Sequence, residues 1–392
     1  MKVTGLFKNF SLKTSNPIAL VCPLDWGIGH AARCVPVAGA LQDQGWKVIV
    51  AADGRPFEFF RNEYPELEMM RFPGPEVRYP RGRGMVLAMA SNIPRLLLGF
   101  RKEHEVLKKL VSETGAGLVI SDNRYGCWHP DVKSVFMTHQ LNIQLPSYMH
   151  RAAPVLRKIN YSFIRNYDEC WVPDVEDEGG LSGRLSHGLK LPVNCHFIGP
   201  LTRFSASVPE PADLPCLAAE IFIMLSGPEP QRRILESLII GQLKETSHTA
   251  IIAGGRTESK ESSVIEGRIH LFSHLPSPLM KHYIENARYV ICRSGYSTLM
   301  DLAALGKPAI LVPYPHAAAN HQELNAQTLV EAGAAVMVKD ADLDVKALST
   351  IKEILVNNAT QQSMGEKSSR LGKPNAGKEI AQKILALGFS KS

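Results

Sequence analysis

Short apolar runs alternate with amphipathic segments along this chain, and that alternation limits the possible folds more than any other feature of the sequence. The apolar run Ile18–Val21 ends just before a Cys-Pro pair, and the loop Leu24–His30 follows it. Four apolar residues then recur at the spacing of one helical face, namely Cys34, Val37, Ala38 and Leu41. Gly45 ends this predicted helix, and Lys47–Ala51 has the pattern of the next strand. Strand, helix and strand in that order predict a βαβ unit and a parallel sheet.

The same alternation continues and then restarts after a stretch that is rich in proline. Further strands are predicted at 118–121, 134–137 and 170–173, with a helix at 103–111. Beyond the prolines of 200–215, strands are predicted at 221–225, 249–253, 289–292 and 309–312. We therefore predict an α/β fold with two doubly wound, Rossmann-like domains that face a central cleft. The expected bounds are 1–200 for the first domain, 201–216 for a linker, 217–375 for the second domain, and 376–392 for a helix that packs back on the first domain.

Composition and charge agree with a globular protein that binds anionic molecules. The 392 residues suffice for two domains, and 45% of them are hydrophobic against 21% charged. The formal net charge of +6 favours a nucleotide, a phosphorylated lipid or an acidic membrane surface as partner. Basic residues are not interleaved with aromatic ones as in a nucleic-acid interface, so we expect no nucleic-acid partner.

The cysteines and the apolar runs bear on the cellular compartment. The 7 cysteines are scattered and form no CxxC pair, which favours free thiols in a reducing compartment over disulfides or zinc. No run resembles a signal peptide or reaches the roughly 18 apolar residues of a membrane span. We therefore expect a cytoplasmic protein.

The stretch from Cys292 to Asp301, with the sequence CRSGYSTLMD, carries the strongest chemical signal. A predicted strand ends at Cys292, the chain turns at Ser294 and Gly295, and a helix is expected from about Ser297. Backbone N–H groups at such a helix start, together with the positive end of the helix dipole, suit a diphosphate. Asp301 lies about one turn further on, where its carboxylate could accept hydrogen bonds from ribose hydroxyls. An ordinary strand–turn–helix corner with an exposed aspartate is the structural alternative.

A second polar stretch follows the next predicted strand. Asn320 and Glu323 have the spacing of a capping box at the start of a helix that runs to Gly333. Capping does not account for His321 and Gln322 in the same first turn. Their polar groups lie near the strand's carboxyl end, where they could hold sugar hydroxyls.

Three segments in this half resemble a known family. CRSGYSTLMD, GKPAILVPYP and ANHQELNAQTLVEAGAA are similar, in order and spacing over Cys292–Ala335, to the donor-binding half of the MurG family, the bacterial UDP-N-acetylglucosamine transferases of peptidoglycan assembly. The loop Gly27–His30 resembles the first glycine loop of that family, and the segment IGPLTR at 198–203 resembles its interdomain segment. The resemblance implies a GT-B fold, with an acceptor domain followed by a donor domain, and metal-independent inverting transfer from a nucleotide-sugar, with UDP as the expected carrier.

Position by position, the resemblance implies a donor site. Ser294 and Gly295 would meet the diphosphate, Asp301 the ribose, and Asn320 with Gln322 the donor sugar. Arg203 would contact the phosphates, and the base would lie at His274-Leu275. The full predicted set is Arg203, Ser226, Gly227, His274, Leu275, Arg293, Ser294, Gly295, Thr298, Asp301, Asn320, His321 and Gln322. The chain departs from the family at Leu225–Pro230, where two prolines remove two backbone donors.

His30 is the predicted catalytic base. In an inverting transfer the acceptor hydroxyl attacks the anomeric carbon and must lose its proton, and histidine suits this because its ordinary pKa is near neutrality. The glycines at 27 and 29 would let the backbone pass close to a ligand. Asp25 and His139 are substitute candidates, and a histidine that only caps the following helix is the structural alternative.

The acceptor side differs from the resembled family. A polar stretch occupies 121–129 and another 138–140, where that family has a glycine-rich segment. The predicted acceptor-side residues are Gly27, Gly29, Asp122, Asn123, Arg124 and His139. We therefore expect a glycan or lipid-linked acceptor and do not predict the peptidoglycan enzyme itself. A buried hydrogen-bond network is the alternative for these residues.

Residues 78–102 combine basic and apolar side chains. Arg78, Arg81 and Arg83 precede one apolar run, and a second apolar run precedes Arg101 and Lys102. This pattern is typical of a surface that lies on anionic lipid, and the resembled family docks on the membrane through the equivalent region. A core helix with snorkelling arginines is the alternative.

No metal and no cofactor are predicted besides the nucleotide-sugar co-substrate. Asp340, Asp342 and Asp344 form a D-x-D pattern like that of metal-using transferases. Their place between a strand and a helix favours capping carboxylates instead. Two rivals to a glycosyltransferase remain, a nucleotide-sugar epimerase of the same architecture and a sensor that binds sugar nucleotides without turnover.

Overall fold

The computed structural model describes residues 16–75, 85–143, 151–177, 180–204, 217–315, 321–343, 357–372 and 376–387, with the backbone alone over 85–93. The first half forms a parallel sheet of seven strands in the order β3-β2-β1-β4-β5-β6-β7. These strands are β1 Ile18–Pro23, β2 Lys47–Ala52, β3 Glu68–Arg71, β4 Leu118–Asp122, β5 Lys133–Met137, β6 Glu169–Val172 and β7 Cys195–Phe197. The helices are α1 Ile28–Asp43, α2 Gly54–Glu63, α3 Met85–Thr114, α4 Ala153–Ile164 and the short 3-10 helix η2 Gly183–Leu185.

The second half repeats this plan in a sheet with the order β10-β11-β9-β8-β12-β13-β14. All its neighbours are parallel except β10, which runs antiparallel to β11 at the edge. The strands are β8 Ile221–Met224, β9 Ala250–Ala253, β10 Ser262–Ile265, β11 Ile269–Phe272, β12 Tyr289–Cys292, β13 Ala309–Leu311 and β14 Ala335–Met337. The helices are α5 Gln231–Lys244, α6 Ser277–Asn286, α7 Tyr296–Ala304, α8 His321–Glu331, η4 Asp340–Asp342, α10 Asn358–Leu371 and α11 Ala376–Ala386.

The central strands are buried on both faces. Ala19 and Val21 of β1 enter one apolar cluster, while Leu20 and Cys22 enter another. This explains why the strands appear in the sequence as continuous apolar runs and not as an alternating pattern. The strand order reverses between β1 and β4 in the first sheet and between β8 and β12 in the second. The predicted α/β fold with two doubly wound halves is therefore confirmed.

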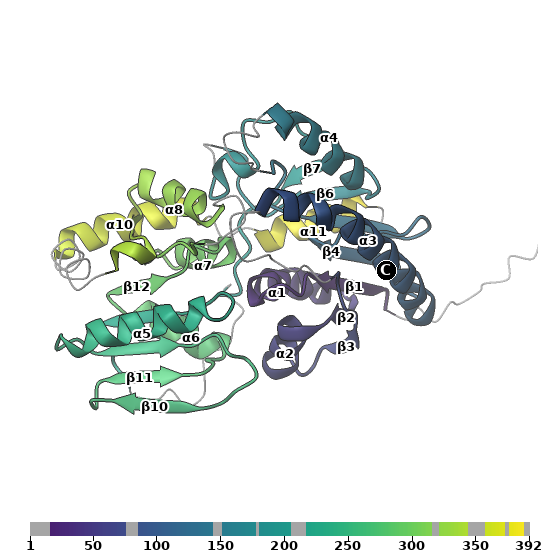
Figure 1. Cartoon of the computed structure of the whole chain (residues 1–392). Helices are drawn as coiled ribbons and strands as arrows, with labels where there is room; N and C mark the ends of the chain where they lie inside the picture. The colour runs from purple at the N-terminus through teal and green to yellow at the C-terminus, as the bar shows by residue number, and fades with distance from the viewer. Residues whose placement is uncertain are drawn as a thin grey trace, which may run out of the picture.

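The chain crosses between the halves and later returns. Figure 1 shows the two halves side by side, with α1 and α7 at their junction and α11 back beside the first sheet. Ile380 and Ile384 of α11 are buried in the same apolar cluster as Val37 of α1. Leu201, at the start of the predicted linker, is 1% exposed, and its N–H meets Met300 Sδ of α7 at 3.1 Å. The start of that segment is therefore packed core, and its residues 205–216 lie outside the described part.

Candidate active site

Three predicted residues meet at the carboxyl edge of the first sheet, where its strand order reverses. His30 follows the loop after β1, Asp122 is the last residue of β4, and His139 lies just beyond β5. Because β1, β4 and β5 are parallel neighbours, their carboxyl ends lie side by side. A doubly wound sheet binds its ligands at such a reversal point.

Asp122 is the centre of this cluster, and it is fully buried. One carboxylate oxygen, Oδ1, accepts hydrogen bonds from Arg33 Nε at 2.8 Å and Arg33 Nη2 at 2.5 Å. The other oxygen, Oδ2, lies 2.8 Å from His30 Nδ1. Burial alone would raise the pKa of this carboxyl, but Arg33 and His30 together hold the pKa of Asp122 below its usual value. Asp122 therefore stays ionised between two fixed partners.

His30 is held by that carboxylate with one ring nitrogen turned away from it. Arg33 Nη2 also lies 2.8 Å from His30 Nδ1, but it donates to Asp122 Oδ1 at 2.5 Å, so we assign the Nδ1 proton to the bond with Asp122. A neutral imidazole in this tautomer keeps its lone pair at Nε2, which is the arrangement of a general base. The side chain is 20% exposed, so the site is open to a ligand. Burial and the neighbouring Arg33 lower the pKa of His30 below 6.5, which keeps the ring neutral at pH 7.

The two substitute bases are less suited. His139 accepts a hydrogen bond from Arg33 Nη1 at its Nδ1, over 3.2 Å, so its free electron pair is already used. Burial, Arg33, His30 and His321 lower the pKa of His139 well below 6.5. Asp25 accepts from the N–H of Gly74 at 2.9 Å, and its other oxygen has no hydrogen-bond partner among the described residues. Of the three candidates, His30 has the best-placed basic atom.

Arg124 does not belong to this cluster. Its side chain is buried, with Nε bound to Glu103 at 2.7 Å and Nη1 bound to the carbonyl of Phe72 at 2.9 Å. The guanidinium also lies 3.8 Å from the centre of the Phe72 ring. These contacts join α3 to the end of β4, so the Arg124 side chain, predicted as an acceptor contact, is directed to other partners in this structure. Asn123, at φ +56°, makes the turn after β4 and gives its N–H to Met137.

The predicted donor residues lie around the reversal point of the second sheet. The loop after β8 carries Ser226 and Gly227, and the loop after β12 carries Ser294 and Gly295. Gly227 has φ +101°, which favours glycine, and Gly295 directly precedes α7. No side chain caps α7, so its first N–H groups have no partner within the helix and face the loop region, with Thr298 in the same first turn. A helix start of this kind can bind an anion, and diphosphate binding at α7 stays a prediction.

The start of α8 is bound to the same loop. Ser294 donates from Oγ to the carbonyl of Gln322 at 2.7 Å, and the side chain of Asn325 donates to the carbonyl of Ser294 at 3.2 Å. The Gln322 side-chain oxygen accepts from the N–H of Tyr314 at 2.9 Å. The structure thus brings Ser294 and Gln322 together, as predicted for neighbouring parts of one site. Asn320 lies outside the described residues.

Arg293, a predicted donor contact, is bound to structural partners. It is fully buried, donates to the carbonyls of Val312 at 3.3 Å and Pro313 at 3.2 Å, and forms an ion pair with Asp340. These bonds tie the end of β12 to the chain beyond β13 and β14. They also give the first carboxylate of the D-x-D pattern a structural partner. Within the described residues no group of three or more His, Cys, Asp or Glu side chains is placed to hold a metal ion.

Asp301 and Arg203 meet each other in this structure. The Asp301 carboxylate is 3% exposed, accepts from Thr202 Oγ1 at 2.8 Å and lies 3.3 Å from Arg203 Nε. Burial raises the pKa of Asp301 despite Arg203. A ribose could reach this carboxylate only by replacing the hydroxyl of Thr202. The predicted ribose contact is therefore occupied by the segment that joins the two halves.

At the predicted base slot, both side chains have partners elsewhere in the protein. The imidazole of His274 is bound across the junction, with Nε2 at 3.0 Å from Glu63 Oε1 of α2. Leu275 is 2% exposed and belongs to the apolar core. Side-chain recognition of a base by these two residues is therefore not available in this arrangement.

Several contacts in the site were not predicted from the sequence. Arg33 lies three positions after His30 on α1, a spacing that places both on one helical face and could have indicated it. Tyr296 stacks on His139, with ring centres 4.0 Å apart and planes 3° apart. Ser297 donates from Oγ to the carbonyl of Gly29 at 2.7 Å. Nothing in the sequence pattern signals these two contacts across the junction.

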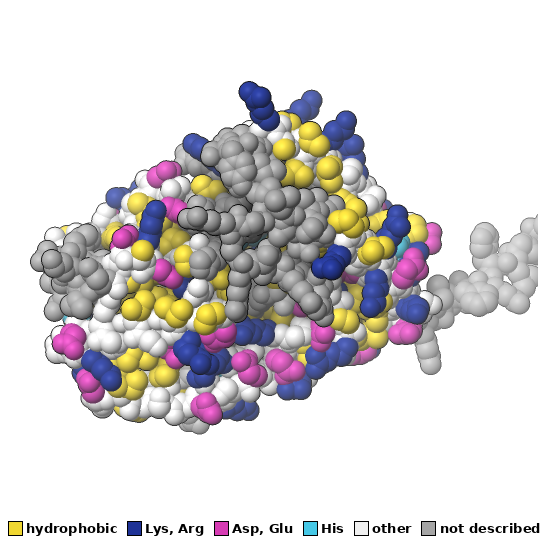
Figure 2. Space-filling model, in the orientation of Figure 1, with side chains coloured by type: hydrophobic (Ala, Val, Ile, Leu, Met, Phe, Trp, Pro, Cys, Tyr) yellow, Lys and Arg dark blue, Asp and Glu magenta, His cyan; other side chains and the backbone are white. Residues whose placement is uncertain are grey.

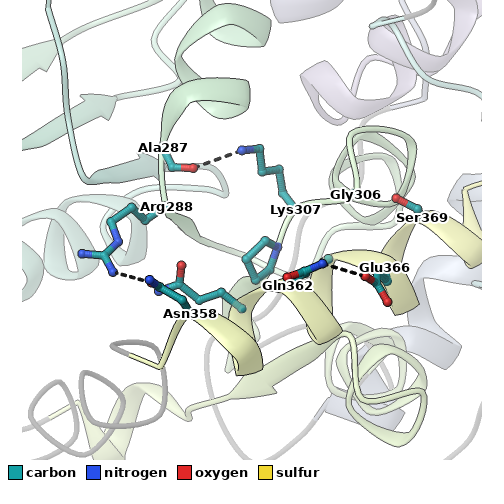
Figure 3. A pocket seen from close by; sticks show the side chains of 11 residues that line it. Ala287, Arg288, Gly306, Lys307, Asn358, Gln362, Glu366 and Ser369 are labelled. Atoms are coloured by element: carbon teal, nitrogen blue, oxygen red, sulfur yellow. Dashed lines mark hydrogen bonds between the residues drawn. The ribbon is translucent and has the colours of Figure 1, made fainter.

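A separate hollow lies at the other end of the second sheet, near the start of β12 and of β13 (Figure 3). Lys307 there is bound to the carbonyl of Ala287 at 3.1 Å, and Arg288 to Asn358 of α10 at 3.1 Å. Gln362 is bound to Glu366 at 3.2 Å in the same helix. None of the residues predicted for the site lines this hollow.

Comparisons with known proteins agree with this layout. Residues 240–383 match the model of the glycosyltransferase family 28 C-terminal domain. The chain is 47% identical over 105 residues to the UDP-N-acetylglucosamine–N-acetylmuramyl-(pentapeptide) pyrophosphoryl-undecaprenol N-acetylglucosamine transferase of Chlorobaculum parvum. This match covers 26% of this chain and 29% of the relative. A transferase of the same name from Rubrobacter xylanophilus is 28% identical over 247 residues, or 62% of this chain and 71% of the relative. The strongest of these matches thus spans less than a third of the relative's length.

Solved structures share the fold over nearly the whole chain. The glycotransferase of kitacinnamycin has a TM-score of 0.67 at 14% identity, covering 95% of this chain and 99% of that one. MurG from Acinetobacter baumannii has a TM-score of 0.58 at 16% identity, covering 95% and 100%. The spinosyn rhamnosyltransferase SpnG, solved with thymidine diphosphate, has a TM-score of 0.63 at 14% identity, covering 95% and 100%. The chain therefore has the GT-B fold, with a MurG-like segment in its second half.

Proposed function

We propose that this protein is a glycosyltransferase that moves a sugar from a nucleotide-sugar, with UDP as the expected carrier, to a hydroxyl group of a glycan or lipid-linked acceptor. The observation that carries this proposal is the pairing of His30 with Asp122 beside the uncapped start of α7. The Ser297–Gly29 hydrogen bond brings these two features together across the junction of the sheets. The family 28 match over 240–383 supports a nucleotide-sugar donor on the α7 side.

The reaction follows as a single displacement. His30 Nε2 takes the proton from the acceptor hydroxyl while that oxygen forms its bond to the anomeric carbon. The bond from the anomeric carbon to the diphosphate oxygen breaks, and the nucleoside diphosphate leaves with the electron pair. Asp122 stabilises the protonated imidazole, and the N–H groups at the start of α7 stabilise the departing charge. Attack from the face opposite the leaving group inverts the anomeric centre.

This mechanism assigns no role to a metal ion. The diphosphate charge is met by the helix start and its dipole, and by Arg203 once Asp301 binds the ribose. EDTA should therefore leave the turnover rate unchanged. Loss of activity with EDTA and recovery with Mg²⁺ or Mn²⁺ would contradict the mechanism.

The decisive experiment is calorimetric titration with UDP, GDP, ADP and dTDP. We expect one nucleotide to bind selectively, and Asp301→Ala to weaken that binding by about 1–3 kcal/mol through loss of a charged acceptor. Thr202→Val is the matched control, because it removes the hydroxyl that occupies Asp301 and keeps the side-chain shape. If the ribose replaces Thr202, this variant binds at least as tightly as the wild type. No binding of any nucleotide would refute the donor site.

The acceptor half also offers a surface for anionic lipid. Within the described part of the chain, no helix is long and apolar enough to cross a bilayer. Leu98 of α3 is 63% exposed and Val155 of α4 is 60% exposed, and the two helices meet where Phe100 packs on Phe163. Figure 2 shows Lys and Arg side chains around exposed hydrophobic ones where α4 lies. The basic residues of segments 94–102 and 151–165, which lie in and next to these two helices, are Arg95, Arg101, Lys102, Arg151, Arg157, Lys158 and Arg165.

Charge complementarity favours a membrane surface as the partner of this α3–α4 face. Residues 94–102 and 151–165 contain no aspartate or glutamate, so cations and exposed apolar groups act together on anionic lipid. The predicted arginines at 78, 81 and 83 lie outside the described residues. We expect the double variant Leu98→Ser and Val155→Ser to reduce co-sedimentation with phosphatidylglycerol vesicles. Ile234→Ser on α5, where Ile234 is 47% exposed, is the matched control and should not change binding. Equal binding by all three proteins would leave α3 as an ordinary core helix.

A further inference from the structure

Tyr296, the first residue of α7, contacts the catalytic cluster of the first half from across the junction. It is 5% exposed although it starts a helix at the junction. Its ring lies flat against His139, with centres 4.0 Å apart, and its hydroxyl donates to the carbonyl of Pro173 at 2.7 Å. A tyrosine fixed at both its ring and its hydroxyl has a single position.

The carbonyl that receives this hydroxyl is itself rigidly held. Asp174, the next residue after Pro173, is fully buried and accepts from the N–H groups of Leu181 at 2.9 Å and Ser182 at 2.7 Å. This turn lies beyond the carboxyl end of β6, next to β5 in the first sheet. The anchor of Tyr296 is therefore part of the acceptor half and not of its own domain.

Tyr296 is connected to His30 through a chain of three contacting residues, His139, Arg33 and Asp122. His139, against which it stacks, accepts from Arg33 at 3.2 Å, and Arg33 holds the same Asp122 carboxylate that orients His30. Next to Tyr296, Ser297 holds the backbone of Gly29, one residue before His30. Two successive residues of the α7 start thus contact both segments that carry the acceptor-side histidines.

The stacking also keeps His139 neutral, which is the form that can accept a hydrogen bond from Arg33. His139 faces Arg33 and His30 from α1, His321 from α8, and Tyr296 from α7. Three of these neighbours are cations or can become cations, so a protonated His139 would repel them. Burial under the tyrosine ring keeps His139 neutral and able to accept the hydrogen bond from Arg33.

We propose that Tyr296, at the start of α7, is a positioning residue that fixes the orientation of the catalytic cluster in the acceptor half. This inference rests on the proposed transferase function. The same helix turn that is expected to bind the diphosphate then also fixes the base, so the cluster is complete only when the two halves are in contact. The reacting groups on either side of the anomeric carbon are thereby placed by one structural element.

The test compares Tyr296→Leu, which removes the stack, with Tyr296→Phe, which keeps it and removes only the hydroxyl. Tyr289→Leu is the control, because Tyr289 is an 8% exposed tyrosine at the far end of β12. We expect Tyr296→Leu to lower kcat about tenfold to a hundredfold and to leave the nucleotide affinity unchanged. The acidic limb of the pH–rate profile should move to higher pH. Tyr296→Phe should recover most of the rate. Equal kcat for Tyr296→Leu and wild type, or parallel losses in Tyr296→Leu and Tyr289→Leu, would overturn the proposal.

A second readout needs no substrate. The imidazole signals of His139 can be titrated by NMR and assigned with His139→Gln. Burial holds the pKa of His139 well below 6.5, so Tyr296→Leu should raise it toward that ordinary value, while Tyr289→Leu should not. An unchanged titration in Tyr296→Leu would refute the positioning role. If the wild type binds no nucleotide but this shift occurs, the transferase proposal fails while the structural role of Tyr296 stands.

Discussion

The two reversal points of this molecule are built from different parts of the chain. In the first sheet, buried side chains meet: Asp122 between Arg33 and His30. In the second sheet, the glycine loops and the uncapped start of α7 present backbone N–H groups, while the buried Arg293 is bound to Asp340 elsewhere. Moving a proton needs a side chain with a tuned pKa, whereas holding a diphosphate needs only oriented amides.

This difference also explains why the sequence resembles known transferases more closely in its second half. A backbone site constrains glycines and helix starts over one continuous stretch, and residues 240–383 form such a stretch that matches the family 28 model. A side-chain cluster draws single residues from several strand ends, which leaves no continuous signature. The acceptor half is accordingly the place where substrate choice can diverge within one fold.

The largest expected effect comes from breaking the two buried arginine pairs. Asp122→Asn should lower turnover about a thousandfold or more, because the base loses the partner that sets its tautomer. It should also lower the free energy of unfolding by about 3–5 kcal/mol, since Arg33 is left buried without its ion pair. Asp340→Asn removes the matching partner of Arg293 and should reduce stability only. Urea unfolding and turnover per folded molecule separate the two effects. Equal turnover losses in both variants would break the comparison.

A smaller effect is expected from acid, and its sign differs between the two sites. Burial lowers the pKa of His30 and His139 below 6.5 in the folded protein. Their contribution to stability is therefore present above about pH 6.5 and is lost as pH falls through the folded values. Burial raises the pKa of Asp301 above 3.8, so that carboxyl favours the folded state more as pH falls through its raised pKa.

Hydrogen exchange can measure this difference directly. Between pH 7.5 and 5.5, after correction for intrinsic rates, protection should fall first in the ends of β4 and β5 and less in β12 and β13. Replacing His139 with Phe should reduce the fall at β5. A uniform loss of protection over both sheets would show that the histidines do not act as a local acid-sensitive cluster.

The smallest effect concerns the glycines of the first loop. A Cβ added at Gly29 would lie 3.1 Å from Ser297 Oγ, whereas one at Gly27 would meet nothing within 4 Å. We expect Gly29→Ala to lower turnover by an amount that corresponds to about 1 kcal/mol, and Gly27→Ala to change it little. Ser297→Ala should partly restore the Gly29→Ala variant by making room. Absence of such coupling would mean that the halves do not meet here during turnover.

Apolar runs predicted the strands well because parallel strands are buried on both faces. β1, β4 and β12 all lie where their runs occur, and the face of α1 is buried as its spacing indicates. Short edge strands were not predicted, since the three residues of β7 and the exposed β10 lack a continuous apolar run. The helix α2 has an interior proline near its start and aromatic residues, and it too was not predicted.

The site also contains residues that were predicted from the sequence and contacts that were not. His30 was predicted from the first glycine loop, and Asp122 and His139 from two polar stretches, and the sheet brings the three together. The ion pairs of Arg124 and Arg293 were not predicted, because their carboxylate partners lie 21 and 47 residues away in sequence and only the fold brings them into contact. Asp301 poses a further problem, since its spacing predicts a ligand contact while its present partner, Thr202, comes from the preceding segment.

The return of the chain to the first half, described for α11, has a mechanical consequence. The polypeptide passes between the halves once beside Leu201 and again before α11, whose Ile380 packs into the cluster around α1. Because the chain crosses twice, the relative movement of the two halves is restricted to rotation about the line that joins the two crossings. Sliding and twisting are opposed, while opening and closing stay available.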